Sequence, residues 1–70
     1  MQVVLNTAGG AVRLVKTDDN RLMVLRAQAR GIPMSMWAVA HVFRAEQRNS
    51  AIIWARSYAD QMERQESDDE

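Results

Sequence analysis

The fold expected from this sequence is decided by residues 11–30, AVRLVKTDDNRLMVLRAQAR, because the pattern of residues changes within this stretch. Residues 11–17 are rich in β-branched side chains, which favour strands. Residues 17–20, TDDN, are of the types that cap the N-terminus of a helix, with acids suited to its first turn. The residues that follow repeat at helical spacing in Leu22, Leu25 and Ala29. We therefore predict that the chain passes from a strand into a helix near Asn20.

The segment before this stretch predicts a β-hairpin over residues 2–17. Residues 2–7 form a second β-branched-rich run, and Ala8-Gly9-Gly10 between the two runs supplies residues that tolerate the backbone of a tight loop. A lone hairpin is marginal in water, so we expect it to pack on helices. Its outer edge, with Val3 and Val4, would stay unpaired.

The segments after it predict three short helices, at about residues 20–30, 36–48 and 51–65. Gly31 and Pro33 end the first helix. Residues 36–43 are apolar on every side except at His41, which is typical of a central buried helix. The alternative is one long helix over residues 35–65. The predicted fold class is mainly α, with an N-terminal hairpin and three helices in a helix-turn-helix-like arrangement.

Length and composition indicate the number of domains and the absence of disulfides. The chain has 70 residues, zero formal net charge, no cysteine and one histidine, so we expect one domain over residues 1–65 without disulfides. The remaining residues 66–70, ESDDE, are expected to form a disordered acidic tail. The N-terminus lacks the basic and apolar regions of a signal peptide, which predicts a cytoplasmic protein.

The side chains that could carry chemistry are few. His41 is expected to pack on Trp37 in the buried helix, and one histidine without cysteine cannot supply a metal site. Asp18 and Asp19 are interpreted as helix caps. We therefore predict no catalytic residue, no metal and no cofactor, and a protein that is not an enzyme.

Part of the sequence resembles Cro/repressor-type helix-turn-helix proteins. The similarity rests on Leu25-Arg26, on Ala29-Arg30-Gly31-Ile32, and on Ser35 with Val39-Ala40. It covers about twenty residues, and it ends where that family has a glycine and this chain has Arg44. The residues that would read DNA bases are replaced here by Ala51-Ile52-Ile53-Trp54. In size and arrangement the chain also resembles small bacteriophage proteins that bind host RNA polymerase.

This resemblance implies a bacteriophage-encoded, non-enzymatic regulator in the bacterial cytoplasm that binds RNA polymerase and inhibits or redirects initiation of transcription. The residues expected to contact the protein partner are Arg44, Arg48, Ile53 and Trp54, with Val3 and Val4 as a second surface. The first alternative is a DNA-binding repressor that would use Arg26, Arg30, Arg44, Arg48 and Arg56. Two further alternatives are an inhibitor of another host machine and a chain that associates with itself as a homodimer.

Overall fold

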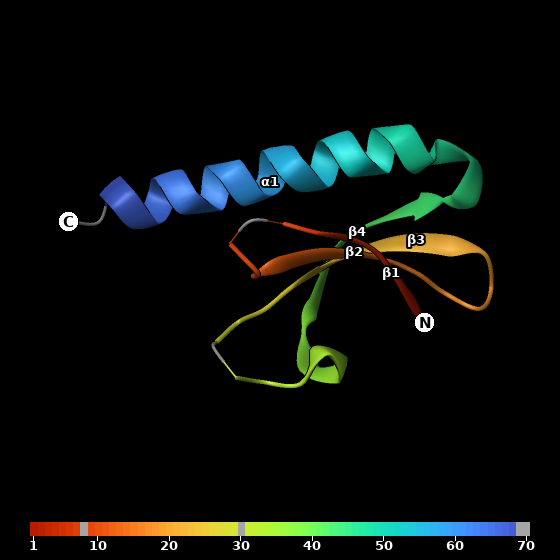
Figure 1. Ribbon diagram of the computed structural model, residues 1–70, viewed down its shortest axis with the longest axis horizontal. Helices are drawn as coiled ribbons and strands as arrows, with labels where there is room; N and C mark the ends of the chain where they lie inside the picture. The colour runs from red at the N-terminus through yellow and green to blue at the C-terminus, as the bar shows by residue number, and fades with distance from the viewer. Residues whose placement is uncertain (8, 30, 69–70) are drawn as a thin grey trace.

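The chain folds into an antiparallel sheet covered on one face by a helix (Figure 1). The computed structural model describes residues 1–7, 9–29 and 31–68, with the backbone alone described at 65–68. Within these residues there are four strands in the order β1-β2-β3-β4 and one α-helix. Their bounds are β1 Gln2–Asn6, β2 Val12–Lys16, β3 Arg21–Arg26, β4 Ala38–Arg44 and α1 Arg48–Asp68, with the 3₁₀ helices η1 Met34–Met36 and η2 Ala45–Gln47.

The prediction of a mainly α fold with three helices is wrong. The predicted helix at 20–30 is replaced by β3, and the predicted helix at 36–48 is replaced by η1, β4 and η2. The chain therefore contains no helix-turn-helix within the residues described. Residues 2–16 do form an antiparallel hairpin, with Val3 opposite Val15. The predicted third helix lies within α1, which begins at Arg48.

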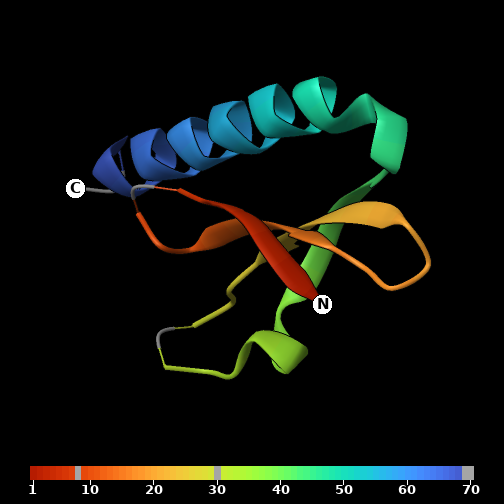
Figure 2. The same ribbon diagram turned by 45° about the vertical axis from the view of Figure 1, so that its right-hand side comes forward.

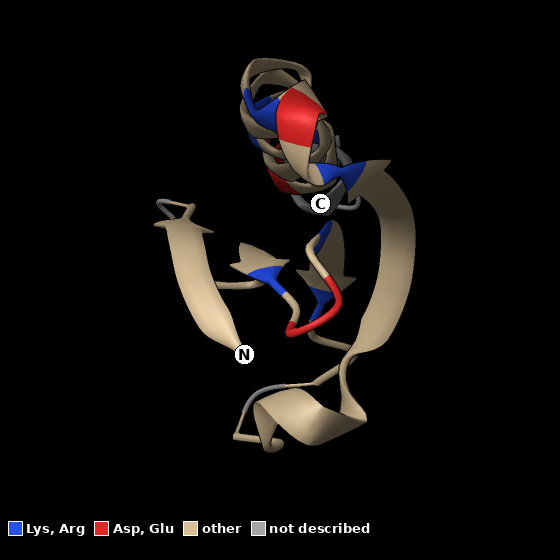
Figure 3. Ribbon diagram, turned by 90° about the vertical axis from the view of Figure 1, so that its right-hand side faces the viewer, with Lys and Arg blue, Asp and Glu red and all other residues tan. Residues whose placement is uncertain are grey.

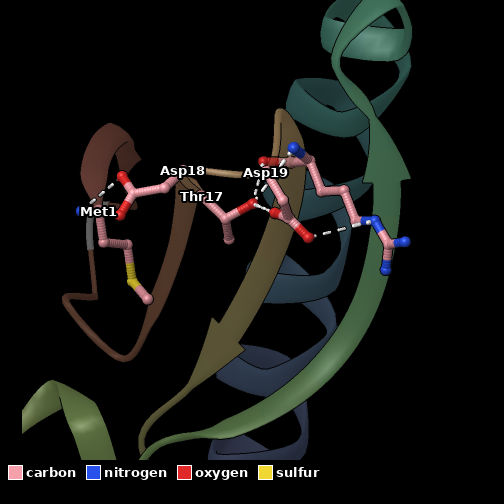
Figure 4. Close-up of polar contacts among 5 residues, drawn as sticks. Met1, Thr17, Asp18 and Asp19 are labelled. Atoms are coloured by element: carbon pink, nitrogen blue, oxygen red, sulfur yellow. Dashed lines mark hydrogen bonds and ion pairs between the residues drawn. The ribbon is translucent and has the colours of Figure 1, made fainter.

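The TDDN segment forms a hairpin turn where the sequence predicted a helix cap. The amide of Asn20 donates to the carbonyl of Thr17, and the amide of Thr17 donates to the carbonyl of Arg21. Asn20 has a φ of 65°, in the left-handed region that closes a three-residue hairpin loop. Figure 4 shows the Thr17 hydroxyl bonded to Asp19, whose carboxylate lies 3.5 Å from the Nε atom of Arg21. The same residue types that cap helices are thus used here to join β2 to β3.

The hydrophobic core lies between the sheet and α1. Strand alternation turns every second residue of β2 and β3 toward the helix. The buried side chains there are those of Val12, Leu14, Leu22, Val24, Ala51 and Ala55, with Phe43, Trp54 and Met62 among the half-buried residues packed against them. Two alanines let α1 approach the strands closely, so the small residues of the helix determine its distance from the sheet.

Both edge strands contain a local irregularity in register. In β1, Val4 has no partner between Val3 and Leu5, and in β4, Ala40 has no partner between Val39 and His41. Each is the extra residue of a β-bulge, which bends a strand and increases its twist. Val4 and Ala40 both pack against the core cluster, so each bulge turns its extra residue toward the core.

The acidic segment at 66–70 is only partly within the described residues. The backbone of residues 66–68 continues α1, which corrects the prediction of a disordered tail for these three residues. Residues 69–70 lie outside the described residues.

Candidate protein-binding surface

The sheet face opposite α1 carries a continuous apolar row. Val3 pairs with Val15, Val15 with Met23, and Met23 with Val42, so the row crosses all strands from β1 to β4. Val15 is fully buried, whereas Val3 and Val42 at the two ends are 41% and 45% exposed. Antiparallel sheets with one solvated face normally carry polar residues on that face. This face, which we call the open face, carries an apolar row across its centre instead.

A second row lies beside the first on the open face. Asn6 pairs with Arg13, Arg13 with Leu25, and Leu25 with Val39. Leu25 is buried, and Val39 is 52% exposed. The connection from β3 to β4 crosses this end of the face, where η1 lies on the side of the sheet away from α1 (Figure 2). The open face is therefore partly covered near Arg13, and the Val3–Val42 row is exposed at its two ends while Val15 between them is buried.

Arginines border the apolar row on both sides. Arg13 lies in the neighbouring row, and on the other side Arg21 pairs with Arg44 at the end of the strands. Strand alternation places Arg21 and Arg44 on the same face as Met23 and Val42. Figure 3 shows that charged residues are concentrated on α1 and around the turn from β2 to β3, whereas η1 has none and β4 has one. An apolar centre with an arginine border matches the composition of protein interfaces.

The residues predicted to bind a protein partner fall on two different faces. Val3 and Arg44 are on the open face, and Val4 is turned toward the core. Arg48 begins α1, and Ile53 and Trp54 also belong to α1, which packs on the opposite face of the sheet. Ile53 is 67% exposed. The sequence-predicted set therefore does not form one surface.

The flank of α1 borders a shallow groove of about 430 Å³. Its lining is uncharged and consists of Ser50, Ile53, Trp54, Ser57, Tyr58 and Gln61. Trp54 stacks on His41 with ring centroids 5.0 Å apart, and Phe43 meets both rings edge-on. The predicted packing of His41 on Trp37 is wrong, because β4 places His41 on the helix side of the sheet. Trp37 instead donates from its indole to the carbonyl of Ile32 and stacks with Arg13.

The residues predicted to bind DNA are also dispersed. Arg26 points toward the helix side, where its Nη1 atom is 3.4 Å from the Tyr58 hydroxyl. Arg48 and Arg56 belong to α1, Arg44 ends β4, and Arg30 lies outside the described residues. With the helix-turn-helix absent, these arginines do not line an element that could enter a groove of DNA.

The described residues contain no cluster of side chains that could hold a metal ion. No three His, Cys, Asp or Glu side chains gather there. Asp18 and Asp19, interpreted from sequence as helix caps, lie instead in the exposed β2–β3 turn, where Asp18 is 3.8 Å from the amino group of Met1 (Figure 4).

The surfaces missed from sequence are those that depend on strand pairing. Met23, Val39 and Val42 become one face with Val3 only when β3 and β4 are aligned.

Among the helices described, none has both the length and the apolar character needed to cross a membrane. Comparison with known proteins finds no matching family model, no similar curated protein and no similar solved structure.

Proposed function

We propose that this chain is a non-enzymatic binding protein that regulates a partner protein by docking its open face on it. The observation that carries the proposal is the apolar row from Val3 to Val42, exposed at both ends on a sheet face that α1 does not cover. Exposed apolar surface with a polar border marks a binding site more often than it marks a solvated surface.

A protein fits this face better than a nucleic acid does. Valine and methionine side chains offer neither phosphate neutralisation nor hydrogen bonds to base edges. Methionine adapts its shape to different apolar partners, and Met23 lies in the row. Arg13, Arg21 and Arg44 are spaced around the apolar centre, where they suit a protein partner with matching acidic groups.

Bacterial RNA polymerase is the first specific partner to test. The resemblance drawn from the sequence implies it, and docking by protein contacts needs no DNA-reading helix. The helix-turn-helix part of that resemblance has been overturned, so the support now comes from the open face and from no fold-level likeness. Inhibition of another host protein uses the same surface and is distinguished by the identity of the partner.

The experiment compares immobilised wild-type protein with Val42→Lys and Ile53→Lys variants. Both substitutions place a lysine at an exposed position, so both variants should stay folded. Purified RNA polymerase and nuclease-treated bacterial lysate are passed over each, and captured proteins are identified by mass spectrometry. We expect a partner that binds the wild type and Ile53→Lys but is lost with Val42→Lys.

Two results would contradict the proposal. Binding that survives Val42→Lys and is lost with Ile53→Lys would move the site to the α1 groove. Binding that disappears after nuclease treatment, and that weakens steeply with salt, would indicate a nucleic acid as the partner.

A further inference from the structure

We propose that Arg13 is the specificity residue of the open face, and that it receives a carboxylate from an acidic and apolar segment of the partner protein. This inference rests on the proposed function, because it names the chemistry of the partner that the open face would take. Among the residues that the structure describes, no acid forms an ion pair with Arg13.

The guanidinium of Arg13 is held in place by uncharged groups. Its Cζ atom lies 4.8 Å from the ring centroid of Trp37, a cation–π distance. Its Nη1 atom is 3.6 Å from the sulfur of Met34, which is a weak acceptor. Its Nε atom is buried and has no hydrogen-bond partner within the described part of the chain. The guanidinium of Arg13 is therefore held in one orientation, but its N–H donors have few acceptors.

The neighbours of Arg13 on the sheet do not supply an acid. Its cross-strand partners are Asn6 on β1 and Leu25 on β3. The ion pairs among the described residues join Asp18 to the amino group of Met1 and Asp19 to Arg21, both at the β2–β3 turn. Partly buried charges are normally paired, because removal from water without a partner is unfavourable. A carboxylate brought by a partner would remove this deficit.

The charges of the open face also indicate whether its binding partner is a second copy of this chain or a different protein. The open face carries Arg13, Arg21 and Arg44, and the acid that accompanies them is Asp19, already close to Arg21. Two copies packed by this face would bring arginines toward arginines, which is unfavourable. A segment with apolar residues for the Val3–Val42 row and a carboxylate for Arg13 matches both features.

The test uses short random peptides displayed on phage and selected on the wild-type protein. We expect the selected peptides to combine apolar residues with an Asp or Glu, and to be lost with Val42→Lys. One such peptide and its version with the acid replaced by the amide are then titrated against wild type, Arg13→Gln and Arg44→Gln by calorimetry. The acid-to-amide change should weaken binding to the wild type by about 30-fold and binding to Arg13→Gln by less than about twofold.

The outcomes separate the two proposals. Selection that yields no peptide sensitive to Val42→Lys overturns the open face as a site, and this inference with it. Peptides that need Val42 but contain no acid, or whose acid preference is unchanged in Arg13→Gln, overturn the role of Arg13 and leave the open face standing. An acid preference lost in Arg44→Gln instead places the carboxylate at the other border. A stable dimer that is abolished by Val42→Lys would assign the face to a second copy and overturn the inference.

A lower melting temperature of Arg13→Gln is expected as well, because the stacking on Trp37 is lost. That effect alone does not support the inference, since a residue with a purely structural role would show it too. The coupling between Arg13 and the peptide carboxylate is the decisive measurement.

Discussion

Trp54 and Tyr58 stack on each other along α1, with ring centroids 5.1 Å apart and ring planes inclined by 21°. They are one helical turn apart, the spacing at which side chains meet on a helix. Through His41, the same stack reaches β4 and joins the helix to the edge of the sheet. The stack therefore joins α1 to the edge strand β4 at the border of the core.

Replacing Trp54 with alanine should lower the free energy of unfolding by about 2–3 kcal/mol, because a half-buried indole and its contacts with both elements are lost. Urea unfolding followed by far-UV circular dichroism measures this loss. A Trp54→Phe variant, which keeps an aromatic ring, should lose clearly less. A loss below about 1 kcal/mol for the alanine variant would show that the stack contributes little.

The turn between β2 and β3 should depend on the left-handed backbone of Asn20. An Asn20→Ala substitution should reduce stability by about 1 kcal/mol, because a Cβ-bearing residue without a polar side chain resists a positive φ. Asn20→Gly should be close to neutral, since glycine adopts this conformation without strain. Denaturation midpoints of the two variants, with exposed Asp18→Ala as the control, test the assignment. Equal losses for alanine and glycine would contradict it.

Enlarging the helix–sheet contact should be destabilising. Ala55 is fully buried between α1 and the strands, so Ala55→Leu should reduce stability by about 1–3 kcal/mol through overpacking. Leucine and alanine differ little in helix propensity, so the loss would come from the contact with the sheet. Gln61→Leu, at an exposed position of the same helix, is the matched control. Similar stabilities of the two variants would place Ala55 outside the core.

Hydrogen exchange should distinguish docking on the open face from strand addition at β4. As an edge strand, β4 bonds to β3 on one side, so the amides that point outward should exchange fast in the free protein. A partner on the open face should leave these amides fast, whereas a partner strand paired to β4 should protect alternate amides. Mass spectrometry of β4 peptides with and without the partner gives the answer.

The two segments interpreted as helices explain what the sequence could and could not predict. Leu22, Met23, Val24 and Leu25 are apolar in succession because β3 has apolar residues on both faces. This hides the alternation that marks a half-solvated strand, and such a run cannot be told from a buried helix by periodicity. The matches at Leu22 and Leu25 were consistent with a helix by chance.

The same ambiguity affected β4. Residues 36–43 were interpreted as a helix because they are apolar on all sides, but Val39, Val42 and Phe43 are of the types that favour strands. The short length of this apolar run, between Pro33 and Arg44, was the feature that favoured a strand over a helix. By contrast, α1 has one apolar arc and one polar arc, so its core residues and the exposure of Ile53 could be predicted.

The candidate site was predictable only in fragments. Val3 and Arg44 were identified from the sequence as contact residues, and the structure places both on the open face. Val42 and Met23, which join them into one surface, required the register of β3 with β4. Long-range pairing of this kind is decided by the whole sheet and leaves no local pattern.

The bulges at Val4 and Ala40 have a consequence for how this protein behaves in concentrated solution. An edge strand with a single charge, such as β4, would ordinarily pair with the edge of another molecule, and repeated addition would grow a filament. A bent and strongly twisted border cannot template a flat ribbon, so growth of that kind stalls after the first contact. The exposed valines Val3, Val39 and Val42 are therefore compatible with a small protein that does not form fibrils in concentrated solution.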